Sequence, residues 1–106
     1  PAPEVHVKSA EEWSRALSRA MNEKYPLIMK GEATSIHMAD GPVRRGVVAR
    51  IGDGELMLVE SQQLVRIPFA SLDEATRLRC DAAFRAQHLN AEVRKRMAAA
   101  SRSRAP

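Results

Sequence analysis

The stretch from Val43 to Phe69 constrains the fold of this chain most, because apolar residues recur there at every second position. A period of two is typical of β-strands that bury one face. Turn-forming residues divide the stretch twice, and the Asp53-Gly54 step supplies the positive φ angles that a tight hairpin needs. The pattern predicts a three-stranded antiparallel meander over residues 43–51, 55–60 and 64–69.

The same alternation predicts which side chains of the meander face the core. In the first strand, we expect Arg44, Val48 and Arg50 to face away from the core. Pro68 cannot donate a hydrogen bond to a ladder, so it marks a strand end or an edge of the sheet. The side chains expected in the core are Val47, Ala49, Ile51, Val65, Ile67 and Phe69.

A helix is predicted before the meander. Ser9 and Glu12 form a capping box, in which each side chain can bond to the backbone N–H of the other residue, so the helix should begin just after Ser9. Trp13 shares an apolar stripe with Leu17 and is expected to be a core anchor buried against the barrel. Pro26 should end this helix, because the residue before a proline is pushed out of the α region.

The segments on either side of this helix carry weaker patterns. Residues 1–8 should form a flexible N-terminus, although the alternating Val5 and Val7 could instead add a short edge strand. The β-branched content of residues 27–38 favours a strand, with Gly31 as a bulge or bend that lets the strand curl.

Two interpretations are open after Phe69. A second capping box over residues 71–74 could start one long helix that runs to Ala100. Alternatively, residues 71–74 form a single helical turn, residues 75–80 form a closing strand, and Asp81 caps a separate helix over 82–99. The clean alternation from Ala75 to Cys80 favours the closing strand. Residues 101–106 are expected to be frayed.

These elements together predict a fold that is mainly β with flanking helices, of the α+β class. The core would be a small five-stranded SH3-like or Sm-like barrel with an N-terminal helix and a basic C-terminal helix. A chain of 106 residues can bury one modest core. We therefore expect a flexible terminus (1–8), a helix plus barrel (9–80), and a C-terminal helix with a basic tail (81–106).

The sequence contains no nucleotide-binding loop, nucleophile elbow, paired acidic motif or zinc-type cysteine spacing. His6, His37 and His88 lie in three different predicted elements, so we expect no metal site, no cofactor and no catalytic residues. Cys80 is the only cysteine and is expected to be a small core residue. A single cysteine fits a reducing compartment, which indicates a cytoplasmic location, and neither a membrane span nor a signal peptide is recognisable.

Basic residues are the remaining candidates for function. The formal net charge is +4, and the segment from residue 94 onward contains five basic residues and no acidic one. Guanidinium groups bind phosphate oxygens bidentately and stack on bases, so a cationic sheet face and a basic arm suit a nucleic acid. Cross-strand pairs with Glu32, Glu55 and Glu60 would neutralise part of this face. The candidate nucleic-acid-binding residues are Arg44, Arg45, Arg50, Arg66, Arg77, Arg79, Arg94, Lys95 and Arg96.

Part of the chain resembles the carboxy-terminal barrel of the bacterial ribosome maturation factor P family. The resemblance covers residues 43–80. The shared order is a basic-Gly strand at Arg45-Gly46, a Gly-Asp hairpin at Gly52-Asp53, a short strand that ends in Ile67-Pro68, a one-turn helix and a closing strand. This resemblance implies an Sm-like barrel and an association with RNA or the ribosome.

Two functions remain open from the sequence. The first is a non-enzymatic RNA- or ribosome-associated binding module that uses the arginine-rich face and the basic arm. The second is a protein–protein adaptor or self-associating SH3-like domain, which could form a homo-oligomer through its C-terminal helix and would carry incidental basic charge. No partner membrane is expected. A DNA-binding regulator is less favoured, because no helix-turn-helix is visible.

Overall fold

The computed structural model describes the backbone of residues 8–103 and the side chains of residues 8–101. The expected strand at Val5 and Val7, nearly all of the expected flexible N-terminus and the last three residues lie outside this range. The helices are α1 (Ala10–Lys24), α2 (Glu74–Leu78) and α3 (Ala82–Ser103), with a short 3-10 helix η1 (Phe69–Ser71). The strands are β1 (Ala33–His37), β2 (Val43–Gly52), β3 (Glu55–Glu60) and β4 (Gln63–Pro68).

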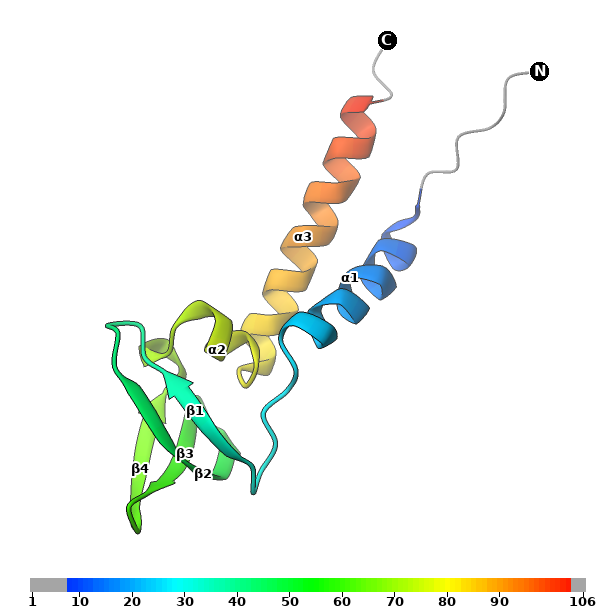
Figure 1. Ribbon diagram of the computed structural model, residues 1–106. Coiled ribbons are helices and arrows are strands. Elements are labelled where there is room, and N and C mark those ends of the chain that lie inside the picture. The colour runs from blue at the N-terminus through cyan, green and yellow to red at the C-terminus, as the bar shows by residue number, and fades with distance from the viewer. Residues whose placement is uncertain (1–7, 104–106) are drawn as a thin grey trace, which may run out of the picture.

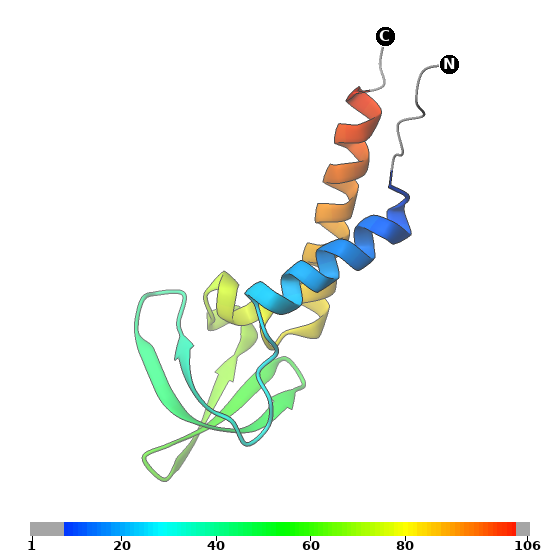
Figure 2. The ribbon, with the colours of Figure 1, turned by 45° about the vertical axis from the view of Figure 1, so that its right-hand side comes forward.

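The molecule is elongated, with the sheet at one end and an arm of two helices at the other (Figure 1). Helices α1 and α3 run antiparallel to each other along this arm, and α2 lies between the arm and the sheet (Figures 1 and 2). The start of α1 and the end of α3 therefore lie far from the strands. Residues 101–103, which were expected to be frayed, continue α3.

The four strands form one antiparallel sheet in the order β1-β2-β3-β4, so the predicted meander is confirmed and β1 precedes it. Two tight turns set its register. Asp53 and Gly54 join β2 to β3 with φ angles of 54° and 77°, and Ser61 and Gln62 join β3 to β4 with φ angles of 49° and 67°. Two-residue turns with positive φ match the natural twist of a hairpin, which explains why these short sequences bring neighbouring strands into register.

The predicted core face of β2 is wrong in part. Val48 is buried, with 1% of its surface exposed, whereas Val47 is 43% exposed. The register between β2 and β3 shifts between Val48 and Arg50, which makes Ala49 the extra residue of a β-bulge. A bulge reverses the phase of the side chains that follow it, so a strict period of two cannot place both halves of this strand.

The core lies between the inner face of the bent sheet and the segments that cross it. Ile36 of β1 is buried. In β4, Ile67 is buried and Val65 is partly buried, so the predicted inward face of this strand is confirmed. The buried cluster comprises Ile28, Ile36, Val48, Leu56, Leu58, Ile67, Phe69, Leu72 and Cys80. The segment before β1 contributes Ile28 rather than a strand, because β1 begins at Ala33.

The predicted closing strand over residues 75–80 is wrong, because these residues form α2 and the turn that follows it. Asp73 is the N-cap of α2, and its carboxylate accepts a hydrogen bond from the Thr76 N–H at 2.8 Å. Thr76 and Leu78 are nevertheless both buried. A one-turn helix that is covered on more than one side can bury alternate residues. Its sequence then shows the same apolar alternation as a half-buried strand.

Without a closing strand, the sheet stays open rather than forming the expected five-stranded barrel. The chain after η1 makes one isolated bridge between Leu72 and Met38, directly beyond β1. Two hydrogen bonds flank this bridge, from the Asp73 N–H to the His37 carbonyl at 3.0 Å and from the Ala39 N–H to the Ser71 carbonyl at 2.9 Å. This segment covers one end of the β1 edge.

Helix α1 is capped by Ser9 and Glu12 as predicted and ends before Pro26. Trp13, however, is half-buried in the helical arm, where Arg96 of α3 lies over its ring at 5.5 Å from the centroid. The expectation that Trp13 is buried against the barrel is therefore wrong. In α1, Met21 is the only buried residue.

Candidate functional site

The structure divides the nine basic residues proposed for nucleic-acid binding among three places. Four lie on the sheet, two on or beside α2, and three on the distal half of α3. Arg44 lies on the inner side of β2, where its guanidinium group pairs with Glu60 at 3.4 Å. Arg44 and Arg45 therefore do not share a face, as neighbouring residues of a strand cannot.

Arg77 and Arg79 hold parts of the fold together instead of extending a cationic sheet face. Arg77 donates from Nε to the Asp81 carboxylate at 2.9 Å and stacks over the Phe84 ring at 4.3 Å. Arg79 donates from Nε to the Pro26 carbonyl at 2.8 Å and lies 3.9 Å from Glu32. These contacts join α2 to α3 and to the end of the α1 segment.

Arg85, which was not among the candidate residues, has a similar structural role. Its guanidinium group donates to the carbonyl oxygens of Tyr25 and Leu78, both at 2.8 Å, and to Asn22 Oδ1 at 2.6 Å. Carbonyl groups at helix ends lack intrahelical partners and carry partial negative charge. Arg85 therefore joins the ends of α1 and α2 to the first turn of α3.

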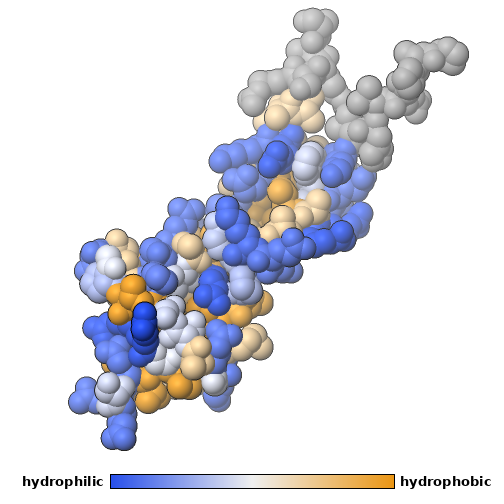
Figure 3. All heavy atoms as spheres, viewed as in Figure 1, coloured by the Kyte–Doolittle hydropathy of each residue, from blue (hydrophilic) through white to orange (hydrophobic). Residues whose placement is uncertain are grey.

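The solvent-facing side of the sheet, here called the outer sheet surface, carries an apolar row across all four strands. The register pairs Ala33 with Val47, Val47 with Val59, and Val59 with Leu64. Val47, Val59 and Leu64 are 43%, 38% and 57% exposed. Hydrophobic residues are visible at the surface of the sheet end and along the seam between α1 and α3 (Figure 3). Single exposed valines are ordinary, but a continuous row is typical of an interaction surface.

Three arginines border this apolar row on the outer sheet surface. Arg45 is exposed, and no acidic side chain among the described residues lies within ion-pair distance of it. Arg50 pairs with Asp53, and Arg66 lies 3.7 Å from Glu55. The Arg66 side chain remains 68% exposed. The border is therefore basic but partly neutralised.

The remaining candidates lie on α3, at the opposite end of the molecule from the sheet. Lys95 pairs with Glu92 at 3.3 Å. Arg94 has no acidic partner within the part of the chain that the structure describes, and Arg96 contacts the Trp13 ring. Sheet and arm therefore present two separate basic regions and not one continuous surface.

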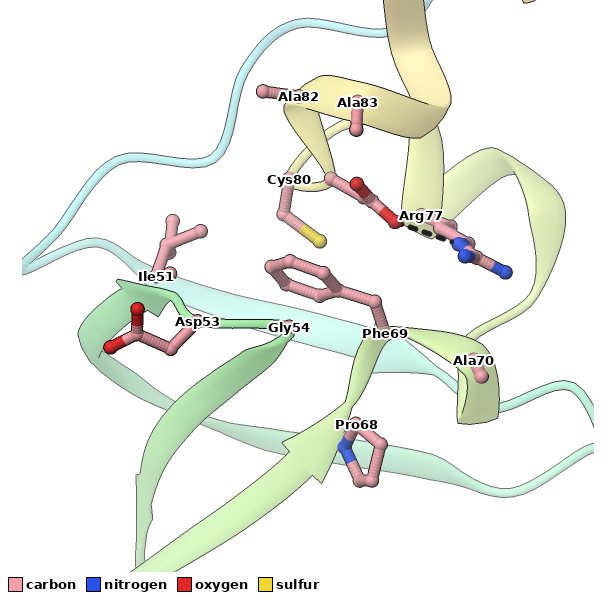
Figure 4. Close-up of a pocket in the computed structure, with 12 residues that line it drawn as sticks. Ile51, Asp53, Gly54, Pro68, Phe69, Ala70, Arg77, Cys80, Ala82 and Ala83 are labelled. Carbon is pink, nitrogen blue, oxygen red and sulfur yellow. Dashed lines mark hydrogen bonds and ion pairs between the residues drawn. The ribbon is translucent and has the colours of Figure 1, made fainter. Parts of the chain in front are cut away.

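A pocket of about 550 Å³ opens between the β2–β3 turn and the start of α3 (Figure 4). The ring of Phe69 and the sulfur of Cys80 face its interior, and the Arg77–Asp81 ion pair lies at one side. Burial raises the pKa of the Cys80 thiol to about 11, with a smaller contribution from the charge of Asp81. The thiol is protonated near neutral pH and no histidine lines the pocket, which disfavours Cys80 as a nucleophile.

The described residues also contain no cluster of histidine, cysteine, aspartate and glutamate that could hold a metal ion. His37 lies at the end of β1 and His88 on α3, and His6 lies outside the described range. No helix in residues 8–103 combines the length and the apolar character that a membrane crossing requires.

Sequence reasoning missed the apolar row, although its residues are all visible in the sequence. A two-residue loop after β3 aligns Val59 with Leu64. The two-residue loop before β3 would place Val48 opposite Val59, and only the bulge at Ala49 brings Val47 there, so the sequence carries a signal for the Val59–Leu64 pair alone. Comparisons of the chain with protein-family models, with curated proteins and with solved structures found no match in any of the three.

Proposed function

We propose that this chain is a non-enzymatic protein-binding module that holds a partner on its outer sheet surface. The observation that carries the proposal is the apolar row of Ala33, Val47, Val59 and Leu64, which crosses four strands and stays exposed. Removing such a row from water favours association by about 25 cal/mol per Å² of apolar surface. A cytoplasmic location, which the single reduced cysteine indicates, belongs to this proposal.

The ion pairs explain why a protein partner is favoured over RNA at the sheet. Arg44, Arg50 and Arg66 each have an acidic neighbour. Arg77 and Arg79 bind other parts of the fold, Asp81 and the Pro26 carbonyl respectively. Aromatic side chains, which would stack on exposed bases, are absent from the apolar row. The outer sheet surface thus offers aliphatic contact with a basic border.

A second candidate function concerns the arm. Arg94 and Arg96 lie on exposed turns of α3, and Arg94 has no acidic partner among the described residues. These residues suit the phosphates of RNA, including ribosomal RNA, as the resemblance of residues 43–80 to a ribosome maturation factor implies. The affinity of such contacts should fall linearly with salt on logarithmic axes, whereas an apolar protein interface should respond little.

Site-specific photocrosslinking in cells that express the protein tests the main proposal. A photoreactive amino acid at position 59 lies in the apolar row, and the same group at Asn90, an exposed position of α3, serves as the control. We expect position 59 to capture a discrete protein that position 90 does not capture. The captured protein is then purified and titrated against the intact chain.

Val47→Asp should weaken that purified complex by about tenfold or more, because it buries a carboxylate without a partner. Asn90→Asp should leave the affinity unchanged. If Val47→Asp binds as tightly as the unaltered chain, or if both positions capture the same set of proteins, the outer sheet surface is not the binding site and the proposal fails.

A further inference from the structure

The two edges of the sheet differ in how their backbone groups are used. At β1, residues 71–73 bond to His37 and Ala39 and cover part of the edge. At β4, no backbone group of residues 8–103 and no side chain of residues 8–101 makes a hydrogen bond to the outer edge. An uncovered edge strand presents unpaired N–H and C=O groups to any extended chain that meets it.

The register identifies which groups of β4 are free. The Phe69 N–H donates to the Gly54 carbonyl at 3.0 Å, directly beyond the last paired residues of β3 and β4. In an antiparallel ladder, hydrogen-bonded pairs alternate with non-hydrogen-bonded pairs. Residues 63, 65 and 67 therefore bond to β3, while the backbone groups of Leu64 and Arg66 point away from the sheet. Pro68 has no N–H, so it leaves no unsatisfied donor there.

The side chains at these free positions have distinct chemistry on the outer sheet surface. Leu64 ends the apolar row and is 57% exposed. Arg66 follows two residues later on the same face, and its Nε atom lies 3.7 Å from the Glu55 carboxylate. The Arg66 side chain is 68% exposed, and within residues 8–101 its guanidinium group makes no hydrogen bond. The edge thus offers an apolar contact and, two residues further on, an available cation.

We propose that β4 receives an extended segment of a partner protein as a fifth strand. The segment carries an apolar residue beside Leu64 and, two positions away on the same face, an aspartate or glutamate beside Arg66. Strand addition supplies main-chain hydrogen bonds, while alternate side chains determine specificity. The inference rests on the proposed function, since it names the partner chemistry and the binding mode of the outer sheet surface.

Charge complementarity favours an acidic segment over a second copy of this chain. Residues 61–68, which comprise the turn and β4, contain Arg66 and no acidic residue. Pairing β4 with β4 of another copy would add a second arginine and no further carboxylate to the edge. An acidic segment instead places a carboxylate where a charge-assisted hydrogen bond can form.

Selection from a random library of linear synthetic peptides, with the intact chain as the target, tests the chemistry. Peptides bound by the unaltered chain should share an apolar residue and an acidic residue at a spacing of two. Arg66→Glu should reduce the affinity of a selected peptide by about tenfold or more and should select basic residues instead. Arg19→Glu, a charge reversal at an exposed position of α1 away from the sheet, is the matched control and should change the affinity little.

Amide hydrogen exchange on the complex with a selected peptide tests the binding mode. In the free chain, the amides of Leu64 and Arg66 should exchange rapidly, whereas that of Val65 should be protected by its bond to β3. In the complex, Leu64 and Arg66 should become protected. The amides of Ala33 and Ser35, at the uncovered part of the β1 edge, should not change.

The possible results separate this inference from the proposed function. Peptides that bind through the apolar row without protecting Leu64 and Arg66 would overturn strand addition and leave the protein-binding proposal intact. A consensus without acidic residues, or one that Arg66→Glu leaves unchanged, would overturn the stated chemistry. Protection of both amides in the chain alone, rising with protein concentration, would show that a second copy occupies the edge. If photocrosslinking captured the same proteins at position 59 as at position 90, the proposed function itself would be overturned.

Discussion

Gly46 shows how one residue without a side chain permits the sheet to form. A Cβ atom at Gly46 would lie 2.2 Å from the backbone oxygen of Val59 and 3.0 Å from Leu58 Cγ. No rotamer change relieves a clash with backbone, so the strands would have to separate. The glycine is therefore a packing requirement, and its backbone does not adopt a positive φ angle.

Gly46→Ala should lower the free energy of unfolding by about 2 kcal/mol or more, because the added methyl group forces β2 away from β3. Urea denaturation measures this change. Ala33→Gly, on the exposed face of the neighbouring strand, is a control and should cost about 0.5–1 kcal/mol through backbone entropy alone. An alanine at position 46 that costs no more than this control would contradict the close approach seen in the structure.

The raised pKa of the Cys80 thiol predicts how the free energy of unfolding depends on pH. Burial raises the pKa of its thiol from 9.0 to about 11, so the folded state holds the proton more tightly than the unfolded state does. This contribution is complete below about pH 9 and is lost as the pH rises through 11. The free energy of unfolding should therefore fall by about 2 kcal/mol more in the unaltered chain than in Cys80→Ala across this interval. Parallel denaturation curves for the two proteins at each pH would contradict the assignment.

At the scale of elements, hydrogen bonds at helix ends join α1, α2 and α3 to one another. The carbonyl groups of Tyr25 and Leu78 both converge on Arg85, and Arg79 bonds to the carbonyl of Pro26. Arg79, which the sequence suggested for phosphate binding, thus binds a backbone carbonyl group, as Arg85 does. Local charge patterns cannot distinguish these two uses, because the carbonyl groups come from distant parts of the chain.

Arg85→Ala should lower the free energy of unfolding by about 2–3 kcal/mol, since it leaves partly buried carbonyl groups without donors. Arg85→Lys should recover part of this loss, because an ammonium group can reach one carbonyl but not three acceptors in fixed directions. Arg45→Ala, at an exposed site without an ion pair, should change stability by less than about 0.5 kcal/mol. Thermal or urea unfolding of the three variants provides the measurement. Equal effects at positions 45 and 85 would contradict the capping role.

At the scale of the whole molecule, the core of the sheet and the seam of the arm differ in how completely they exclude water. Leu58 is fully buried, whereas Trp13, Leu17 and Leu89 are all half-buried in the seam between α1 and α3. Local opening requires less free energy where fewer apolar contacts are lost. The arm should therefore open more readily than the sheet.

Leu58→Ala should cost about 2–5 kcal/mol of global stability, as truncations in a core do. Trp13→Ala should cost less than Leu58→Ala and should act locally, speeding amide exchange in α1 without changing exchange in β2 and β3. Native-state hydrogen exchange distinguishes local from global effects. Uniformly faster exchange in both helices and strands of Trp13→Ala would show that arm and sheet unfold as one unit.

Local interactions in the sequence determined α1, its capping box and the three-stranded meander, because caps and two-residue turns involve residues only a few positions apart. Tertiary contacts decided the features that such local interactions do not determine. The bulge at Ala49 changed which valines are buried, and residues 74–78 form a helix capped by Asp73 although the burial of Thr76 and Leu78 follows a strand-like alternation. Arg77, Arg79 and Arg85 became structural for the same reason, since their partners converge only in the folded chain. The apolar row is an intermediate case. Its residues can be identified from the sequence, but their alignment depends on hydrogen bonds across four strands.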